Sequence, residues 1–253
     1  MPTSADRYRR VRVPTDIVTH AEVSFCAGPA DFLDPVQGGA LIGIPGGEIG
    51  TLACMVADAA GQPLAVTAGH VVRKVPGAIG GGRLVQQPTT QPPGMPAGAT
   101  LRCGRTIRGF LGNQVDGFRD FVLIKLDTRA GISEPLDEFP SSLAVLAEAA
   151  VVSSKLPVSK LGAATGRTFG VFSSQVPTIT IEGMVANDVW EFVGVGTLFA
   201  QKGDSGALVV SAAPGSQGAI VGILFATAPP QVDSPGGRGF VFPFGRITGV
   251  RPA

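Results

Sequence analysis

The chain has 253 residues, of which 44% are hydrophobic and 15% charged, and its formal net charge at pH 7 is +1. This balance has no basic or acidic excess of the kind that attracts nucleic acid or an anionic membrane, so we expect neither as a partner. The 36 glycines and 21 prolines stand among apolar residues, which is typical of short strands and tight turns and not of a disordered chain.

Residues 1–40 are predicted to be an N-terminal extension, and the first 20 of them are polar with a short run of arginines. No apolar stretch follows these charges, as a secretory signal would require, and no run approaches the roughly 18 apolar residues of a membrane helix. Cys26, Cys54 and Cys103 are spaced without a disulfide or metal pattern, which favours reduced thiols. We therefore expect a cytoplasmic protein without a metal or other cofactor.

The middle of the chain is predicted to form short strands joined by tight turns. Glycine-rich residues 38–43 come first, a hairpin turn is expected at 58–61, and residues 75–99, rich in glycine, proline and glutamine, are expected to be an exposed loop. The predicted strands lie at 50–56, 63–67, 100–103, 106–110 and 120–126.

The sequence then changes character before strands return. Residues 127–131 are polar and 141–152 are rich in alanine and leucine, which predicts a connector over 131–155 with one or two helical turns. Beyond it the pattern of short apolar runs resumes. The predicted strands lie at 170–174, 178–182, 190–195, 207–211, 219–225 and 239–242.

The segment 203–206, Gly-Asp-Ser-Gly, is the strongest candidate for a catalytic site. The apolar, β-branched run after it predicts that Ser205 lies in a tight turn leading into a buried strand. Gly203 lets the backbone turn its N–H groups inward beside the hydroxyl. The amides of Gly203 and Ser205 would then hold the negative oxygen that appears when a serine attacks a carbonyl.

A nucleophilic serine needs a base, and the chain has only two histidines. His70 follows an apolar strand and a small-residue turn, whereas no such element delivers His20, which we interpret as a surface or packing residue. The third group would be an acid that orients the imidazole. Asp120 opens an apolar strand and is favoured for this place, and Asp116, in the turn before that strand, is the alternative.

The order His, Asp, Ser and three short segments resemble the chymotrypsin-like serine peptidases. Residues 67–70, Thr-Ala-Gly-His, are similar to the family's Thr-Ala-Ala-His segment, and 203–206 to its Gly-Asp-Ser-Gly. Residues 120–126 resemble the strand that carries the family's catalytic aspartate. Residues 160–170 resemble a Gly-x-x-Thr-Gly-x-Thr-x-Gly hairpin of bacterial members, and 38–52 resembles intracellular trypsin-like peptidases of bacteria and plants.

The resemblance implies an all-β fold of two six-stranded antiparallel β-barrels with the active site between them. The first barrel would cover residues 41–130 and carry the histidine and the aspartate. The second would cover 156–253, carry the serine, and end in a segment at 244–250 that resembles the family's closing helix.

The resemblance also implies the activity of a serine endopeptidase on a protein or peptide substrate. His70 would take the proton of Ser205 and pass it to the leaving amine, and Asp120 would orient His70. The floor of the specificity pocket lies six residues before the serine in the family, which is Phe199 here. One wall would be Leu224, Phe225, Ala226 and Thr227. A floor without an acid disfavours a Lys or Arg preference, and the large Phe199 predicts a shallow pocket for small or medium apolar side chains.

The chain differs from secreted members of the family in its activation signal. Those enzymes free an Ile-Val-Gly-Gly N-terminus, whose amine pairs with the acid before the serine, and no such tetrapeptide precedes the first strands here. Asp204 therefore needs another partner, an arginine or a backbone N–H. Without one, the oxyanion hole would stay unformed until a partner protein or a cleavage activates it.

Two other functions stay open. A catalytically silent or latent scaffold of this kind would act as a protein-binding module. An esterase could use the same triad, although the usual Gly-x-Ser-x-Gly turn ends here in Ala207, and the alternation of parallel strands and helices of that fold is absent.

Overall fold

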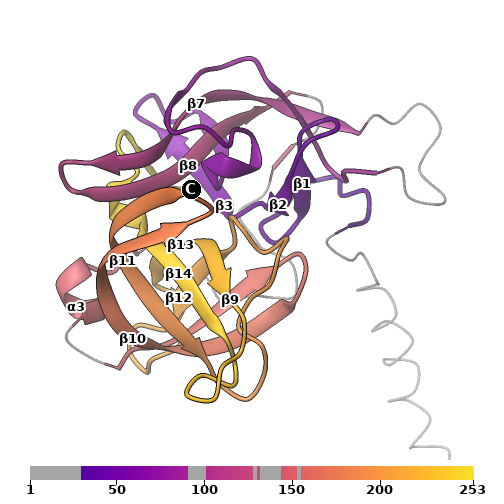
Figure 1. Ribbon diagram of the computed structural model, residues 1–253. Coiled ribbons are helices and arrows are strands. Elements are labelled where there is room, and N and C mark those ends of the chain that lie inside the picture. Colours follow the sequence, from indigo (N-terminus) through magenta and orange to yellow (C-terminus); the bar gives the residue numbers. More distant parts are fainter. Residues whose placement is uncertain (1–29, 91–100, 128–129, 132–143, 153–154) are drawn as a thin grey trace, which may run out of the picture.

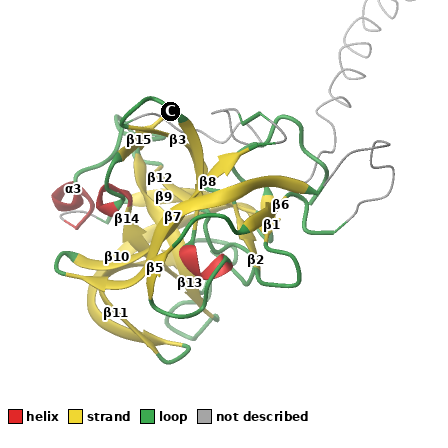
Figure 2. Ribbon diagram, turned by 90° about the horizontal axis from the view of Figure 1, so that it is seen from above, coloured by secondary structure: helices red, strands yellow, loops and turns green. Residues whose placement is uncertain are grey.

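The computed structural model describes residues 30–90, 101–127, 130–131, 144–152 and 155–253. Within these ranges the chain forms two antiparallel β-structures, which lie one above the other in Figure 1. Helical elements are confined to two 3₁₀ turns and one short helix among the described residues, and Figure 2 shows strands throughout both halves. The arginine run, His20 and Cys26 lie outside the described residues, as do parts of the predicted loop 75–99 and connector 131–155.

The first half is a curled sheet of nine strands in the order β15-β3-β4-β8-β7-β6-β1-β2, with β5 paired to β7. Its strands are β1 (Leu41–Gly43), β2 (Ile49–Thr51), β3 (Cys54–Asp58), β4 (Pro63–Thr67), β5 (Gly77–Ile79), β6 (Leu84–Gln86), β7 (Arg102–Gln114), β8 (Gly117–Leu126) and β15 (Val250–Pro252).

The long β7–β8 hairpin gives this sheet its curl. Its register shifts between Thr106 and Arg108, as at a β-bulge, and a bulge bends and twists a strand. Gly109, next to the shift, lies so close to β8 that an added Cβ would be 2.3 Å from the carbonyl oxygen of Phe121. The prediction of a loop over 75–99 missed β5 and β6, which pair with β7 despite their glycine-rich surroundings.

The second half is a closed six-stranded barrel in the order β10-β11-β14-β13-β12-β9. Its strands are β9 (Pro157–Gly162), β10 (Gly166–Ile181), β11 (Met184–Gly194), β12 (Leu208–Ser211), β13 (Ile220–Ala228) and β14 (Arg238–Pro243), and the helix α3 (Glu148–Val152) precedes them.

The two strands predicted at 170–174 and 178–182 are one strand, β10, which continues through a register shift near Ser174. The hairpin turns only at Glu182 and Gly183, whose φ angles of 49° and 80° are the left-handed values that a two-residue turn requires.

The C-terminal segment 244–250 does not form the closing helix that the resemblance implied. A 3₁₀ turn, η3 (Phe244–Arg246), is followed by β15, which pairs with β3 of the first half. Gly245 and Gly249 disfavour a helix here, and Gly249 has a φ of 73°. The last described strand therefore joins the sheet that holds the first ones, beside β3 (Figure 2).

Two hydrophobic clusters stabilise the fold. One lies inside the second barrel around Trp190, Phe192 and Phe199. The other is continuous from the first sheet to the facing side of the barrel, where the rings of Phe118 and Phe225 have centroids 4.8 Å apart. Because apolar surface is buried across the junction, the two halves are held in a fixed relation to each other.

Candidate active site

His70 lies where the strand β4 ends at the junction of the two halves. Ala68 is extended, and a 3₁₀ turn, η1 (Gly69–Val71), then turns the ring toward β8. Gly69 is required for this approach, because a Cβ there would lie 3.0 Å from Oδ1 of Asp120 and 3.1 Å from the carbonyl oxygen of Phe110. The small residues of this turn therefore leave the space in which His70 approaches Asp120.

Asp120 holds His70 through two hydrogen bonds. The backbone N–H of His70 donates to Oδ1 at 2.9 Å, and the ring Nδ1–H donates to Oδ2 at 2.6 Å. The carboxylate is fully buried, whereas the imidazole is 25% exposed. Since an ionised carboxylate only accepts, this contact selects the tautomer in which Nε2 carries the free lone pair. His70 can thus act as a proton acceptor at Nε2.

Asp116 does not reach His70. It lies in the exposed turn between β7 and β8, where its carboxylate pairs with Arg119 at 2.6 Å. The hydrogen bond and charge of Arg119 lower the pKa of Asp116. The structure thus brings Asp120, and not the alternative acid, to the imidazole.

The pKa of His70 is raised above its ordinary value. Burial of the ring is the largest single effect and lowers the pKa, but the charge and hydrogen bond of Asp120 oppose it. The charges of Glu182 and Glu48 add to the increase. The imidazole is therefore a stronger base than a free histidine.

The nucleophile loop is held by backbone contacts from both halves. The carbonyl oxygen of Ser205 accepts from the N–H of Thr51 at 2.7 Å, and the N–H of Gly206 donates to Leu224 at 2.7 Å. Gly206 has a φ of 97°, and a Cβ there would lie 2.2 Å from the carbonyl oxygen of Thr51. Only glycine fits this place.

Thr51, fully buried on β2, links three segments that are distant in sequence. Its hydroxyl donates to the carbonyl oxygen of Gly203 at 2.8 Å and accepts from the N–H of Ala163 at 2.9 Å. Its carbonyl oxygen accepts from the hydroxyl of Thr67 at 2.7 Å. A first-half residue thereby fixes the peptide between Gly203 and Asp204 in the second half.

Two amides of this loop are left for a ligand. Gly203 has a φ of 103°, a conformation that favours glycine. Within the described part of the chain, neither the N–H of Gly203 nor that of Ser205 donates a hydrogen bond. Two adjacent unsatisfied donors beside a hydroxyl are the arrangement that stabilises a developing oxyanion.

Asp204 forms a buried ion pair with Lys160 of β9. The ammonium lies 2.9 Å from Oδ2, and both side chains are fully buried. The carboxylate also accepts from the N–H groups of Ala164, Thr165 and Gln201 at 2.9–3.1 Å, and from the hydroxyl of Thr165 at 2.7 Å. Gly162 makes room for it, since a Cβ there would lie 2.2 Å from Oδ1.

Burial lowers the pKa of Lys160, while the charge and hydrogen bond of Asp204 raise it in part. The sequence analysis did not single out this lysine. Its signal is a lone charged residue in the otherwise uncharged strand that opens the second barrel.

A cavity of about 300 Å³ joins these groups. His70, Asp120, Gly203 and Ser205 all line it, which places the two halves of the candidate site around one space. Phe225, Ala226 and Thr227, which the resemblance assigned to the pocket wall, line it as well. Other lining residues were not among those named from sequence: Glu48, Ile49, Lys74, Ile181, Glu182, Met184, Gln201 and Lys202.

Phe199 and Leu224, the other two predicted pocket residues, are fully buried in the core cluster of the second barrel and do not line this cavity. The ring of Phe199 lies between Gly170 and Gly239, where added Cβ atoms would approach it to 2.9 and 2.6 Å. It stacks on Phe192 with centroids 6.4 Å apart.

Other chemistries have little support among the described residues. Burial raises the pKa of the Cys54 thiol to about 12, which keeps it protonated, and the buried Cys103 thiol donates to the carbonyl oxygen of Val85. In the described ranges no three His, Cys, Asp or Glu side chains gather where they could hold a metal ion. The same ranges contain no helix with the length and apolar character needed to cross a membrane.

Comparison with known proteins identifies the fold. No protein-family model and no curated protein matches the sequence. Among solved structures, a Nocardiopsis protease is 18% identical with a TM-score of 0.57, over 86% of this chain and 98% of that chain. Chymotrypsin of Cellulomonas bogoriensis is 18% identical with a TM-score of 0.58, over 87% and 98%. Protease A of Thermobifida fusca is 16% identical with a TM-score of 0.59, over 87% and 98%.

These likenesses confirm the prediction of an all-β, chymotrypsin-like fold with two barrel-like halves. The second half is the closed six-stranded barrel, and the first is the curled sheet of nine strands. The chain therefore shares the fold of these three proteins.

Proposed function

We propose that this protein is a serine endopeptidase. One observation carries the proposal most: His70, fixed by two hydrogen bonds to buried Asp120, lines the same cavity as Ser205 and the unpaired amide of Gly203. A base with a selected tautomer, a hydroxyl and an anion-binding turn around one space are what acyl transfer needs.

In the proposed mechanism, Ser205 attacks the carbonyl carbon of a peptide bond as Nε2 of His70 takes its proton. The carbonyl oxygen becomes an oxyanion held by the amides of Gly203 and Ser205, each worth about 2.7–4 kcal/mol in measured cases. His70 then gives the proton to the leaving amine, and an acyl-enzyme forms. Water, deprotonated by His70, releases the acid product and restores Ser205.

The described contacts favour a loop that is ready for catalysis without an activating partner. The reason to expect such a partner was an Asp204 with no cation, and Lys160 supplies one from within the chain. Gly203 is also anchored through its carbonyl oxygen by Thr51. We therefore propose that the folded chain hydrolyses its substrate without prior cleavage.

The proposed preference at the residue before the scissile bond is for a small or medium apolar side chain. The cavity wall includes Ile49, Ile181, Met184, Phe225 and Ala226. Phe199 does not form the floor of this pocket. Its ring fills the core of the second barrel and leaves no deep channel there, which also supports a shallow pocket. The buried carboxylate of this cavity, Asp120, is already bound by His70, and Glu182 is exposed, so neither supplies the free buried acid that would favour a long basic side chain.

A fluorophosphonate probe tests the proposal, because it reacts only with an activated serine. We expect one adduct by intact mass on the wild-type chain, and none on Ser205→Ala or His70→Ala. Ser173→Ala, at an exposed serine of β10, is the matched control and should label as the wild type does. If the probe labels the chain and the chain hydrolyses esters but not peptides, the esterase is favoured. If the folded protein forms no adduct, the binding scaffold is favoured.

The proposed mechanism also predicts the pH dependence of kcat/KM. Only neutral His70 accepts a proton, so the rate should rise with pH through the pKa of the free enzyme. Since Asp120, Glu182 and Glu48 raise that pKa, we expect the midpoint above about 6.5. Glu182→Gln should move the midpoint down, because it removes one of these charges. Rates measured from pH 5 to 9 check this, and a midpoint below 6 would contradict it.

A further inference from the structure

A second cavity is also lined by His70, but not by the nucleophile Ser205. It has a volume of about 640 Å³ and is lined by Ile44, Gly47, Glu48, His70, Val71, Val72, Arg73, Lys74, Val75 and Arg83. It shares His70, Glu48 and Lys74 with the first cavity but includes neither Ser205 nor Gly203. The two spaces therefore meet at the imidazole.

The position of this cavity relates it to the leaving group. In the proposed mechanism, His70 delivers a proton to the departing amine, so the part of the substrate after the scissile bond must pass beside the imidazole. The first cavity holds the acyl side, where Ser205 and the oxyanion amides lie. The second is thus the space that the leaving segment enters.

The charges of the second cavity are unbalanced. Its one acid, Glu48, already pairs with Lys74 at 2.9 Å. Arg73 and Arg83 form no ion pair with any residue in the described ranges; Arg73 donates to the carbonyl oxygen of Ala78 at 2.6 Å, and Arg83 to that of Val72 at 2.7 Å. Each guanidinium has five N–H donors, so most of them are left for a ligand.

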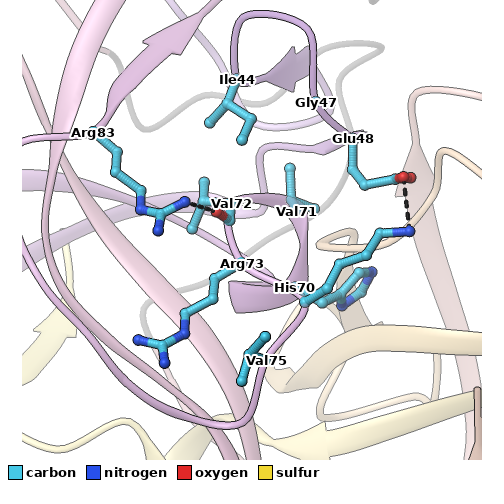
Figure 3. A pocket seen from close by; sticks show the side chains of 10 residues that line it. Ile44, Gly47, Glu48, His70, Val71, Val72, Arg73, Val75 and Arg83 are labelled. Atoms are coloured by element: carbon cyan, nitrogen blue, oxygen red, sulfur yellow. Dashed lines mark hydrogen bonds and ion pairs between the residues drawn. The ribbon is translucent and has the colours of Figure 1, made fainter. Parts of the chain in front are cut away.

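Figure 3 shows how these groups are arranged. Arg73 and Arg83 lie on one side of the cavity with their guanidinium groups apart, and Glu48 lies across from them on the side of His70. Apolar side chains of Ile44, Val71 and Val75 line the space between. A chain that enters beside His70 would pass the Glu48–Lys74 ion pair and the apolar surface before it reached the two arginines.

We propose that this cavity binds a carboxylate that the substrate carries on the leaving-group side of the scissile bond. The inference rests on the proposed peptidase function and names its substrate class. A guanidinium group suits a carboxylate because its planar donors match the two oxygens, and this cavity offers two such groups. The carboxylate has two sources: an Asp or Glu side chain soon after the cleaved bond, or the C-terminus of the substrate itself.

Matched peptides separate these sources. A peptide that the chain cleaves is the starting point. It is made in pairs that carry Glu or Gln at one of the first three positions after the scissile bond. Each peptide is made both with a C-terminal acid and with a C-terminal amide. We expect the carboxylate form to have a kcat/KM at least about tenfold higher, the size of a charge-assisted hydrogen bond. A gain at one internal position identifies a side chain, and a gain only from the terminal acid identifies the C-terminus.

Variants assign the effect to the arginines. Arg73→Gln and the double variant Arg73→Gln/Arg83→Gln should reduce the preference to within about twofold. Arg251→Gln removes the same charge from an exposed place on β15 and should keep the preference. Fluorophosphonate labelling checks that each variant is folded, and Arg73→Gln alone decides if the double variant fails to fold.

Binding to Ser205→Ala separates this inference from the peptidase proposal. Calorimetry with the same uncleaved peptides measures the preference even if the chain hydrolyses none of them, and failure to hydrolyse or label would count against the peptidase alone. Equal affinity for Glu, Gln, acid and amide forms would overturn the carboxylate site. So would a preference that survives in Arg73→Gln/Arg83→Gln.

Discussion

Asp120→Asn is expected to lower kcat for peptide hydrolysis by about 10⁴-fold while the chain stays folded. The carboxylate accepts from both the backbone N–H and the ring Nδ1–H of His70. An asparagine can keep only one acceptor in this place and would turn an N–H₂ donor toward Nδ1. The imidazole would then carry its proton on Nε2, where it could not take the proton of Ser205.

The control for this variant is Asp116→Asn, which removes an equal charge four residues away. Asp116 is exposed and pairs with Arg119, so we expect its loss to change kcat by less than about threefold. Steady-state kinetics on one peptide compares the two variants directly. A loss of similar size in both, or a loss below about tenfold in Asp120→Asn, would contradict the assigned triad.

Lys160→Met is expected to lower the free energy of unfolding by about 3 kcal/mol and to abolish labelling of Ser205. The substitution leaves Asp204 buried without its cation, and removal of one partner from a buried pair is costly. The three backbone N–H groups that remain on the carboxylate keep the loss from being larger. Urea denaturation measures the change.

A double variant separates the charge from the side-chain packing. Lys160→Met/Asp204→Asn has no buried charge at this place, so it should be more stable than Lys160→Met alone. Lys202→Met is the control, because that ammonium is 86% exposed and its loss should shift stability by less than about 0.5 kcal/mol. A single variant as stable as the wild type would show that Asp204 does not depend on Lys160.

The sequence predicts best what is local. His70, Asp120 and Ser205 each stand in a short segment whose strand or turn can be identified from a few neighbours. The contact between His70 and Asp120 follows from the pairing of β4 with β8, in which Thr67 lies opposite Val122. These contacts need no detail of the wider structure beyond the strand order.

Predictions that depended on distant contacts were less complete. The partner of Asp204 lies 44 positions away in β9. A lysine in a strand is ordinarily expected to be solvated, and only the closed barrel buries this one. Phe199 has the spacing of a pocket floor, but Gly170 and Gly239 open a space into which its ring packs. Side-chain direction at such a place depends on residues that no local pattern contains.

The contacts of Thr51 determine when, during synthesis, the loop that carries Ser205 can be anchored. The hydroxyl that anchors Gly203 comes from β2 in the first half, and the serine it supports is made much later in synthesis. The strand β15, which completes the first sheet, also follows the serine along the chain. A nascent chain whose two halves have not docked therefore lacks the contact that anchors Gly203, and under the proposed mechanism it would not yet hydrolyse peptides.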